Sequence, residues 1–95
     1  MSEAHGNVTE DNERIRVTTW TFSQAGAAIG HHRHDFDYVV VPVTGGTFTV
    51  TDPDGSQHEM TQRAGTAYLG TAGTEHDVAS SSEGEAVFVE IELKG

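Results

Sequence analysis

The stretch GAAIGHHRHDFDYVVVPVTGG, residues 26–46, places three histidines in four positions shortly before a run of valines. An imidazole buried without a partner destabilises a protein by on the order of 1–3 kcal/mol, so these rings need hydrogen-bond partners or a metal ion. His32 and His34 stand two positions apart, and in a β-strand their side chains point the same way, with Cα atoms about 6.6 Å apart. Imidazoles at that spacing can converge on one ion. The pair predicts a metal site, but an isolated His-x-His motif is weak evidence, and the elements around it must support the assignment.

The elements around the histidines have the pattern of β-strands separated by turns. From Arg14 onward the chain is rich in Thr, Val, Phe, Trp and Tyr, and glycines interrupt it. Segments of strand length are RIRVTTWTF, YVVVPV, TAYLG, HDVAS, EAVFVEIEL and the hairpin GGTFTVTDPDGSQHEMTQ, with DPDG as its turn. No segment of ten residues has helical periodicity. Seven or eight short strands predict an all-β sandwich or barrel, and eight strands in two Greek keys form a jelly roll.

Alternation along the strands indicates which side chains face the interior. In RIRVTTWTF the apolar residues change parity near Thr18, which predicts a β-bulge there. In EAVFVEIEL the apolar residues alternate with Glu90 and Glu92. The two glutamates are therefore expected on the outer face of the last strand, away from the site.

Two motifs in this chain resemble those of the cupin superfamily, which in outline are G-x5-HxH-x3,4-E-x6-G and G-x5-PxG-x2-H-x3-N. The residues that match the first motif in register are Gly26, His32, His34 and Gly45, and those that match the second are Gly65, Gly73 and His76. The resemblance extends over about residues 14–93. It implies a double-stranded β-helix, the jelly-roll barrel of cupins, with a metal ion held by His32, His34 and His76.

The chain departs from the family pattern at the carboxylate ligand. Tyr38 stands where the first motif has glutamate, while Thr71 replaces the proline and Ser80 the final asparagine. Alternation puts Tyr38 on the side of the histidines and Asp37 on the other, so Asp37 would reach the ion only if a bulge reversed it. A phenol has an ordinary pKa of about 10. We therefore expect Tyr38 beside the ion as a proton donor or substrate anchor; coordination by Tyr38 or by Asp37 are the alternatives.

The other histidines are expected outside the metal site. His31 neighbours the ligands but has the opposite parity, which places it on the rim, and His58 is expected at the surface of the hairpin's return strand. His5 belongs to the acidic segment 1–12, which has no periodicity and is expected to be a flexible tail or an arm that orders on a neighbour. The remainder, residues 13–95, is then a single cupin domain.

Three histidines imply chemistry at one divalent transition metal ion. Neutral imidazoles leave its 2+ charge uncompensated, which favours anionic or chelating ligands and lowers the pKa of bound water. Iron is the first choice, and zinc, nickel, manganese and copper are further candidates. The resemblance to three-histidine cupins implies a dioxygenase-like enzyme acting on a small organic acid or diketone, with Tyr38 as the catalytic side chain. The alternatives are a lyase or isomerase, a binding module without turnover, a hydrogen-bonded histidine patch without metal, and a domain that only dimerises.

Composition restricts the partners of this protein. Fifteen acidic and five basic residues give a net charge of −10, which repels nucleic acids and anionic membranes. The chain has no cysteine, so any metal ion must be held by His, Asp, Glu or Tyr. No signal-peptide pattern and no apolar run of transmembrane length are found, so a cytoplasmic protein is expected. Edge strands of a jelly roll are normally covered or paired, and cupins commonly pair through them, so we expect a homodimer.

Overall fold

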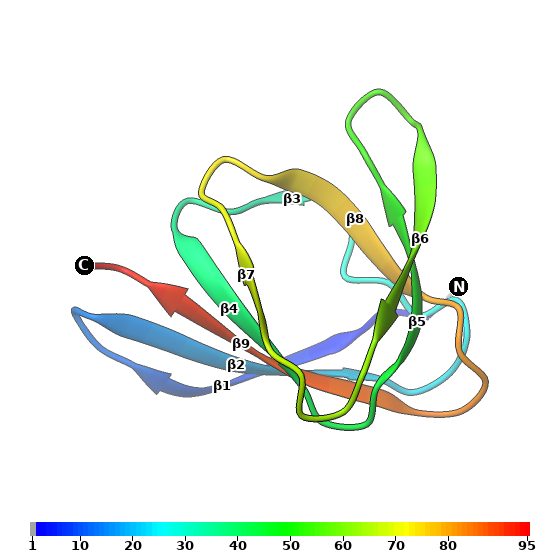
Figure 1. Ribbon diagram of the computed structural model, residues 1–95, viewed down its shortest axis with the longest axis horizontal. Helices are drawn as coiled ribbons and strands as arrows, with labels where there is room; N and C mark the ends of the chain where they lie inside the picture. The colour runs from blue at the N-terminus through cyan, green and yellow to red at the C-terminus, as the bar shows by residue number, and fades with distance from the viewer. Residues whose placement is uncertain (1) are drawn as a thin grey trace.

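The structure is a computed structural model that describes residues 2–95, and its regular elements are all β-strands (Figure 1). In chain order they are β1 (His5–Asp11), β2 (Ile15–Phe22), β3 (His32–Arg33), β4 (Asp37–Pro42), β5 (Gly46–Thr51), β6 (Gln57–Gln62), β7 (Tyr68–Gly70), β8 (Glu75–Ser80) and β9 (Ala86–Leu93). Residues 2–95 contain no helix, and therefore none that is long and apolar enough to cross a membrane. The all-β architecture expected from the sequence is confirmed.

The strands form two antiparallel sheets that curl towards each other into a barrel (Figure 1). One sheet has five strands in the order β1-β2-β9-β4-β7, and the other has four in the order β3-β8-β5-β6. Strands distant in sequence are neighbours, because β9, the last strand, lies between β2 and β4. This topology brings β3 and β8, which carry the histidines, to face the inner side of β4 and β9 across a common interior.

Three phenylalanine rings close one end of this interior. Phe22 on β2, Phe48 on β5 and Phe88 on β9 are at most 4% exposed, and their ring centroids lie 5.1, 5.4 and 5.7 Å apart. Each pair of this kind stabilises the fold by about 0.5–1.5 kcal/mol beyond the burial of its area. The register of β9 against β4 places Phe88 beside Pro42, at the end of β4 that lies away from Tyr38 and the histidines. The aromatic core therefore joins the two sheets and leaves the other end for polar groups.

Strand β2 does not contain the bulge that the sequence predicts. It pairs with β9 in one uninterrupted register, so Thr18 keeps its place in the ladder. The change of parity arises because Ile15 and Val17 lie on the outer face of the sheet, which is itself apolar, whereas Phe22 lies on the inner face. The irregularity in this sheet is in β1 instead, next to Val8.

Strand β1 forms within residues 1–12, the segment that the sequence predicts to be a flexible tail or an arm that orders on a neighbour. Its backbone pairs with β2 from His5 to Asp11, although every one of its seven residues is exposed. The side chain of Asp11 ties the strand to the rest of the sheet, because Lys94 Nζ and Arg16 Nε both donate to it, at 2.5 and 3.3 Å. An edge strand of this kind needs only unpaired backbone N–H and C=O groups on the neighbouring strand. It can therefore form without the alternating apolar residues by which a strand is predicted. His5 itself is exposed, as expected.

The short strand β7 fixes the position of Tyr38. Gly70 lies directly opposite Tyr38 in the β4–β7 ladder, and a Cβ atom at Gly70 would lie only 2.0–2.5 Å from atoms of the tyrosine ring. The ring therefore occupies the space that any larger residue at position 70 would need. Tyr38 is 5% exposed as a result.

We expect Gly70→Ala to destabilise the protein by about 1–3 kcal/mol, because its methyl group overpacks against the Tyr38 ring. Urea unfolding followed by the fluorescence of Trp20 measures this change. In a Tyr38→Ala background the ring is gone, so the same substitution at position 70 should have a much smaller effect. An equal loss of stability in both backgrounds would contradict the contact.

Candidate metal site

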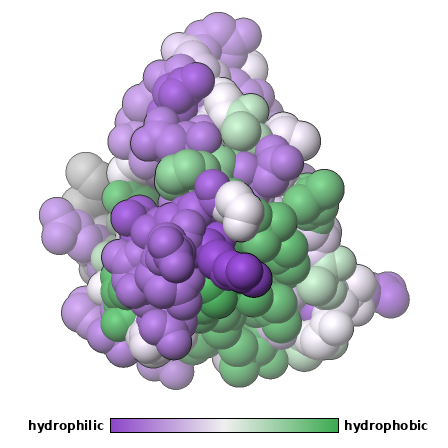
Figure 2. Space-filling view, turned by 90° about the vertical axis from the view of Figure 1, so that its left-hand side faces the viewer, coloured by the Kyte–Doolittle hydropathy of each residue, from purple (hydrophilic) through white to green (hydrophobic). Residues whose placement is uncertain are grey.

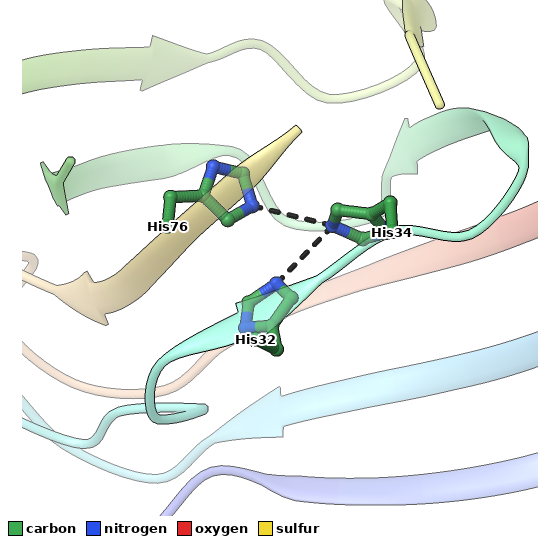
Figure 3. Close-up of side chains that lie close together, drawn as sticks. All are labelled: His32, His34 and His76. Atoms are coloured by element: carbon green, nitrogen blue, oxygen red, sulfur yellow. Dashed lines mark hydrogen bonds between the residues drawn. The ribbon is translucent and has the colours of Figure 1, made fainter. Parts of the chain in front are cut away.

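The three histidines come from two adjacent strands of the four-stranded sheet and from the residue that follows one of them (Figure 3). His32 on β3 lies directly opposite His76 on β8, and His34 follows immediately after β3. The backbone of His34 is held on both sides: its N–H donates to the carbonyl of Thr74 at 2.8 Å, and its carbonyl accepts from the N–H of Gly73 at 2.8 Å. Backbone hydrogen bonds thus hold His34 in place beyond the end of the two-residue strand β3.

The three imidazoles point their Nε2 atoms towards one another (Figure 3). His34 Nε2 lies 3.1 Å from His32 Nε2 and 3.2 Å from His76 Nε2. The ring planes are close to perpendicular, at 84°, 69° and 89°. Two nitrogens at this separation, each bonded at about 2.0–2.1 Å to a shared ion, subtend an angle of about 100°. His32, His34 and His76 therefore form a group that can hold a metal ion.

The protonation of the rings suits this use. The Nδ1 atom of His32 lies 2.7 Å from the carbonyl of Gly30 and donates its proton there, which leaves the lone pair of Nε2 free. Burial, with the neighbouring His32 and His76, lowers the pKa of His34 to about 4. Burial also lowers the pKa of His76. At neutral pH His34 and His76 are thus neutral, the form in which imidazole binds metals.

Hydrogen bonding among the rings does not account for this arrangement. His34 Nε2 is close to both other Nε2 atoms. Neutral His32 has its single proton on Nδ1, so only His34 Nε2 could supply a proton to the contact with His32, and that nitrogen carries at most one proton and donates it in one direction. At least one of the two close contacts would then lack a proton aligned between the nitrogens. A shared cation satisfies all three lone pairs at once, so the geometry favours a metal site over a hydrogen-bonded patch.

The side chain of Tyr38 faces the histidines and that of Asp37 faces solvent, as the alternation along the strand predicts. The ring of Tyr38 stacks on His34, with ring centroids 3.8 Å apart and planes 19° from parallel. Burial, followed by the charge of Glu90, raises the pKa of Tyr38, so its phenol stays protonated at neutral pH. Asp37 is exposed, and its Oδ1 accepts a hydrogen bond from the N–H of Ala72 at 2.8 Å. Tyr38 thus lies beside His34 with a protonated hydroxyl group, whereas the carboxylate of Asp37 bonds the turn after β7.

The histidines lie in the wall of a cavity of about 270 Å³ between the two sheets. Its walls are mainly apolar, with Val40, Val50 and Val78 among the side chains that line it. Ligand pockets for drug-sized molecules are larger, from about 300 Å³ upwards. The cavity therefore suits a small organic molecule.

Glu90 lies in this cavity, contrary to the expectation that it faces outwards. It is 9% exposed and lines the cavity, and burial, followed by the charge of Glu92, raises its pKa to about 7. Glu90, Glu92 and His34 each place one oxygen or nitrogen atom within 4.8 Å of the others. Alternation in β9 does not reveal its inner face, because the valines and isoleucine cover the outer face of the sheet, while the inner face carries Phe88 and both glutamates.

The remaining histidines lie outside the three-histidine group. His31 is exposed and its Nε2 lies 2.7 Å from a carboxylate oxygen of Glu75, on the rim as expected. His58 is exposed as expected, but it also lines the cavity, with its Nδ1 3.7 Å from Asp52 Oδ2. The hairpin of β5 and β6, which carries His58, reaches the cavity because β5 pairs with β8. The sequence around His58 gives no sign of this long-range pairing.

Comparisons with known proteins agree with this fold. No protein-family model matches the chain. The β-alanine degradation protein BauB of Pseudomonas aeruginosa is 47% identical over 92 residues, which cover 97% of this chain and 95% of that protein. The crystal structure of a cupin domain from Bordetella pertussis is 42% identical, covers 99% of this chain and 96% of that one, and has a TM-score of 0.92.

A more distant structure shows the same fold without close sequence similarity. The RmlC-like cupin with a double-stranded β-helix fold from Methanocaldococcus jannaschii is 11% identical, with a TM-score of 0.77, covering 98% of this chain and 82% of that one. The two sequence motifs, the two-sheet barrel and the similarity to BauB along nearly its whole length all indicate the same family. The chain belongs to the cupin superfamily, in the same family as BauB.

Proposed function

We propose that this protein is a cytoplasmic, metal-dependent cupin enzyme with a dioxygenase-like reaction on a small anionic or chelating organic molecule. His32, His34 and His76 would hold one divalent transition metal ion, with iron as the first choice. The observation that carries the proposal is the convergence of three Nε2 atoms at 3.1 and 3.2 Å. A divalent ion held by neutral imidazoles supplies Lewis acidity and, as iron, redox chemistry.

The side chains around the proposed ion have separate roles. The apolar walls of the cavity exclude water from the ligand, which strengthens its electrostatic interactions with the polar groups. Tyr38, protonated and stacked on His34, would donate a hydrogen bond from its hydroxyl to the ligand. Because no lysine or arginine lines the cavity among the described residues, the ion would be the main group that neutralises a carboxylate on the ligand.

The relative's name supports a small substrate. BauB is named for the degradation of β-alanine, a compact molecule with a carboxylate. A compound of this size suits a cavity of about 270 Å³. We therefore propose short carboxylic acids as the substrate class. Oxygen consumption by the iron-loaded protein distinguishes an oxygenase from a lyase, an isomerase or a binding module, none of which consumes oxygen.

We expect the purified protein to retain about one metal ion per chain, and His32→Ala and His76→Ala to reduce the content to background, because each removes one of three ligands. Elemental analysis of protein purified without chelators or an affinity tag measures this. His31→Ala is the matched control, since its ring lies outside the group, and it should keep the ion. The same metal content in all four proteins would refute the site.

Tyr38→Phe should leave metal affinity unchanged and weaken ligand binding or turnover, because it removes only the hydroxyl donor. Asp37→Asn should change neither, since its carboxylate bonds the backbone of Ala72. Metal titrations of both variants measure the first effect, and activity or ligand binding the second. Weaker metal binding in Tyr38→Phe, with loss of a visible charge-transfer band in the ferric protein, would make Tyr38 a ligand. Metal loss in Asp37→Asn would instead assign that role to Asp37.

We also propose a homodimer through the outer face of the five-stranded sheet. The aliphatic residues of this face, all at least partly exposed, are Ile15, Val17, Val39, Val41, Leu69, Val87, Val89, Ile91 and Leu93. Figure 2 shows a broad hydrophobic area over the centre and lower right of the molecule, and strands β1, β2 and β9 of this sheet lie in the lower part of Figure 1. A contiguous apolar area of this kind typically marks an interface, and β1 adds an unpaired edge beside it.

The dimer should tighten as salt concentration rises, because two chains of net charge −10 repel each other and salt screens that repulsion. Light scattering across a salt series gives the mass. Val89→Glu should favour the monomer by placing a charge in the interface, whereas Thr61→Glu on β6 should not. A monomer mass at every salt concentration would rule the dimer out.

A further inference from the structure

The cavity has a second polar group that the proposed metal chemistry does not use. Glu90 is 9% exposed and lines the cavity, and its oxygens come within 4.8 Å of a ring nitrogen of His34. It is not part of the group formed by all three histidines. Its neighbour on the same face, Glu92, accepts from Arg16 Nη1 at 3.2 Å, whereas no ion pair among residues 2–95 engages Glu90.

We propose that the carboxylate of Glu90 binds the amino group of the ligand, so that the cavity selects short amino acids over acids of the same length without an amine. This inference rests on the proposed function, since the ligand's carboxylate is taken to bind at the three-histidine site. The ligand then spans two poles of one small cavity, a cationic pole at the histidines and an anionic pole at Glu90.

The charges around the cavity support an amine rather than a second acid. The acidic residues that line it are Glu90 and Asp52, and no lysine or arginine does so among the described residues. A carboxyl group held in an apolar cavity keeps its negative charge only if a cation or several donors offset its lost hydration; otherwise it takes up a proton. The ammonium group of an amino acid supplies both a charge and donors, and charge-assisted hydrogen bonds of this kind are about twice as strong as neutral ones.

The spacing of the two poles limits the length of the ligand. A carboxylate oxygen of Glu90 lies within 4.8 Å of a ring nitrogen of His34. The carboxylate and the amine of the ligand must therefore be separated by a short chain. The apolar walls of Val40 and Phe88 lie beside Glu90 and would contact the carbons between the two charged groups. α-, β- and γ-amino acids of the simplest kind satisfy these conditions and are small enough for a cavity of about 270 Å³.

The test is calorimetric binding to protein loaded with zinc, which avoids turnover. Three matched pairs serve as probes: glycine and acetate, β-alanine and propionate, γ-aminobutyrate and butyrate. In at least one pair we expect the amino acid to bind about 10- to 100-fold more tightly than its partner, the range of a hydrogen bond to a charged group. Glu90→Gln should abolish this preference, and Glu92→Gln, the matched control on the same face, should keep it.

Several outcomes would overturn the inference. Equal affinities within all three pairs, or an unchanged preference in Glu90→Gln, would show that Glu90 does not read the amine. Loss of zinc in Glu90→Gln would make it a metal ligand instead. If the wild-type protein holds zinc but binds no probe, the amine proposal fails while the metal site stands. If the wild-type protein holds no metal, the proposed function itself fails, and the two-pole ligand fails with it.

Discussion

The candidate site depends on one short contact between strands, the pairing of His32 on β3 with His76 on β8. Strand β3 has only two residues, so its own ladder contributes little to its stability. Its position is held instead by the backbone bonds of His34 to the turn before β8 and by the Tyr38 ring stacked on His34. A bound ion would add a further link between the three rings, because metal binding to a group that exists only in the folded state stabilises that state.

Tyr38 connects this contact to the other sheet. Its ring touches His34 on one side and fills the space left by Gly70 on the other. The phenol therefore performs the packing role of a large buried residue at the position where the family motif has a carboxylate. The ring thus gives the steric support beside His34, and the carboxyl group of the inner wall lies elsewhere, at Glu90.

Much of the site could be predicted from the sequence. The features that could not be predicted have a single cause. The spacing of His32, His34 and His76 and the inward parity of Tyr38 are local properties, and the structure places all four as expected. The strand order, the inward position of Glu90 and the formation of the exposed strand β1 depend instead on which elements become neighbours in the fold. Alternation shows that two faces differ, but it identifies the inner face only if that face is the more apolar one.

Strand β9 is the clearest instance of this rule failing. Its outward residues, such as Val89 and Ile91, are aliphatic, whereas Glu90 faces the cavity. A slip of one residue would exchange the two sets, moving the glutamate to the apolar outer face and an aliphatic side chain to the site. Pairing with β2 on one side and β4 on the other opposes that slip, because both ladders would have to break together. The central position of β9 in its sheet therefore protects the polarity of the cavity, and the hydrophobic pattern of the strand alone would not.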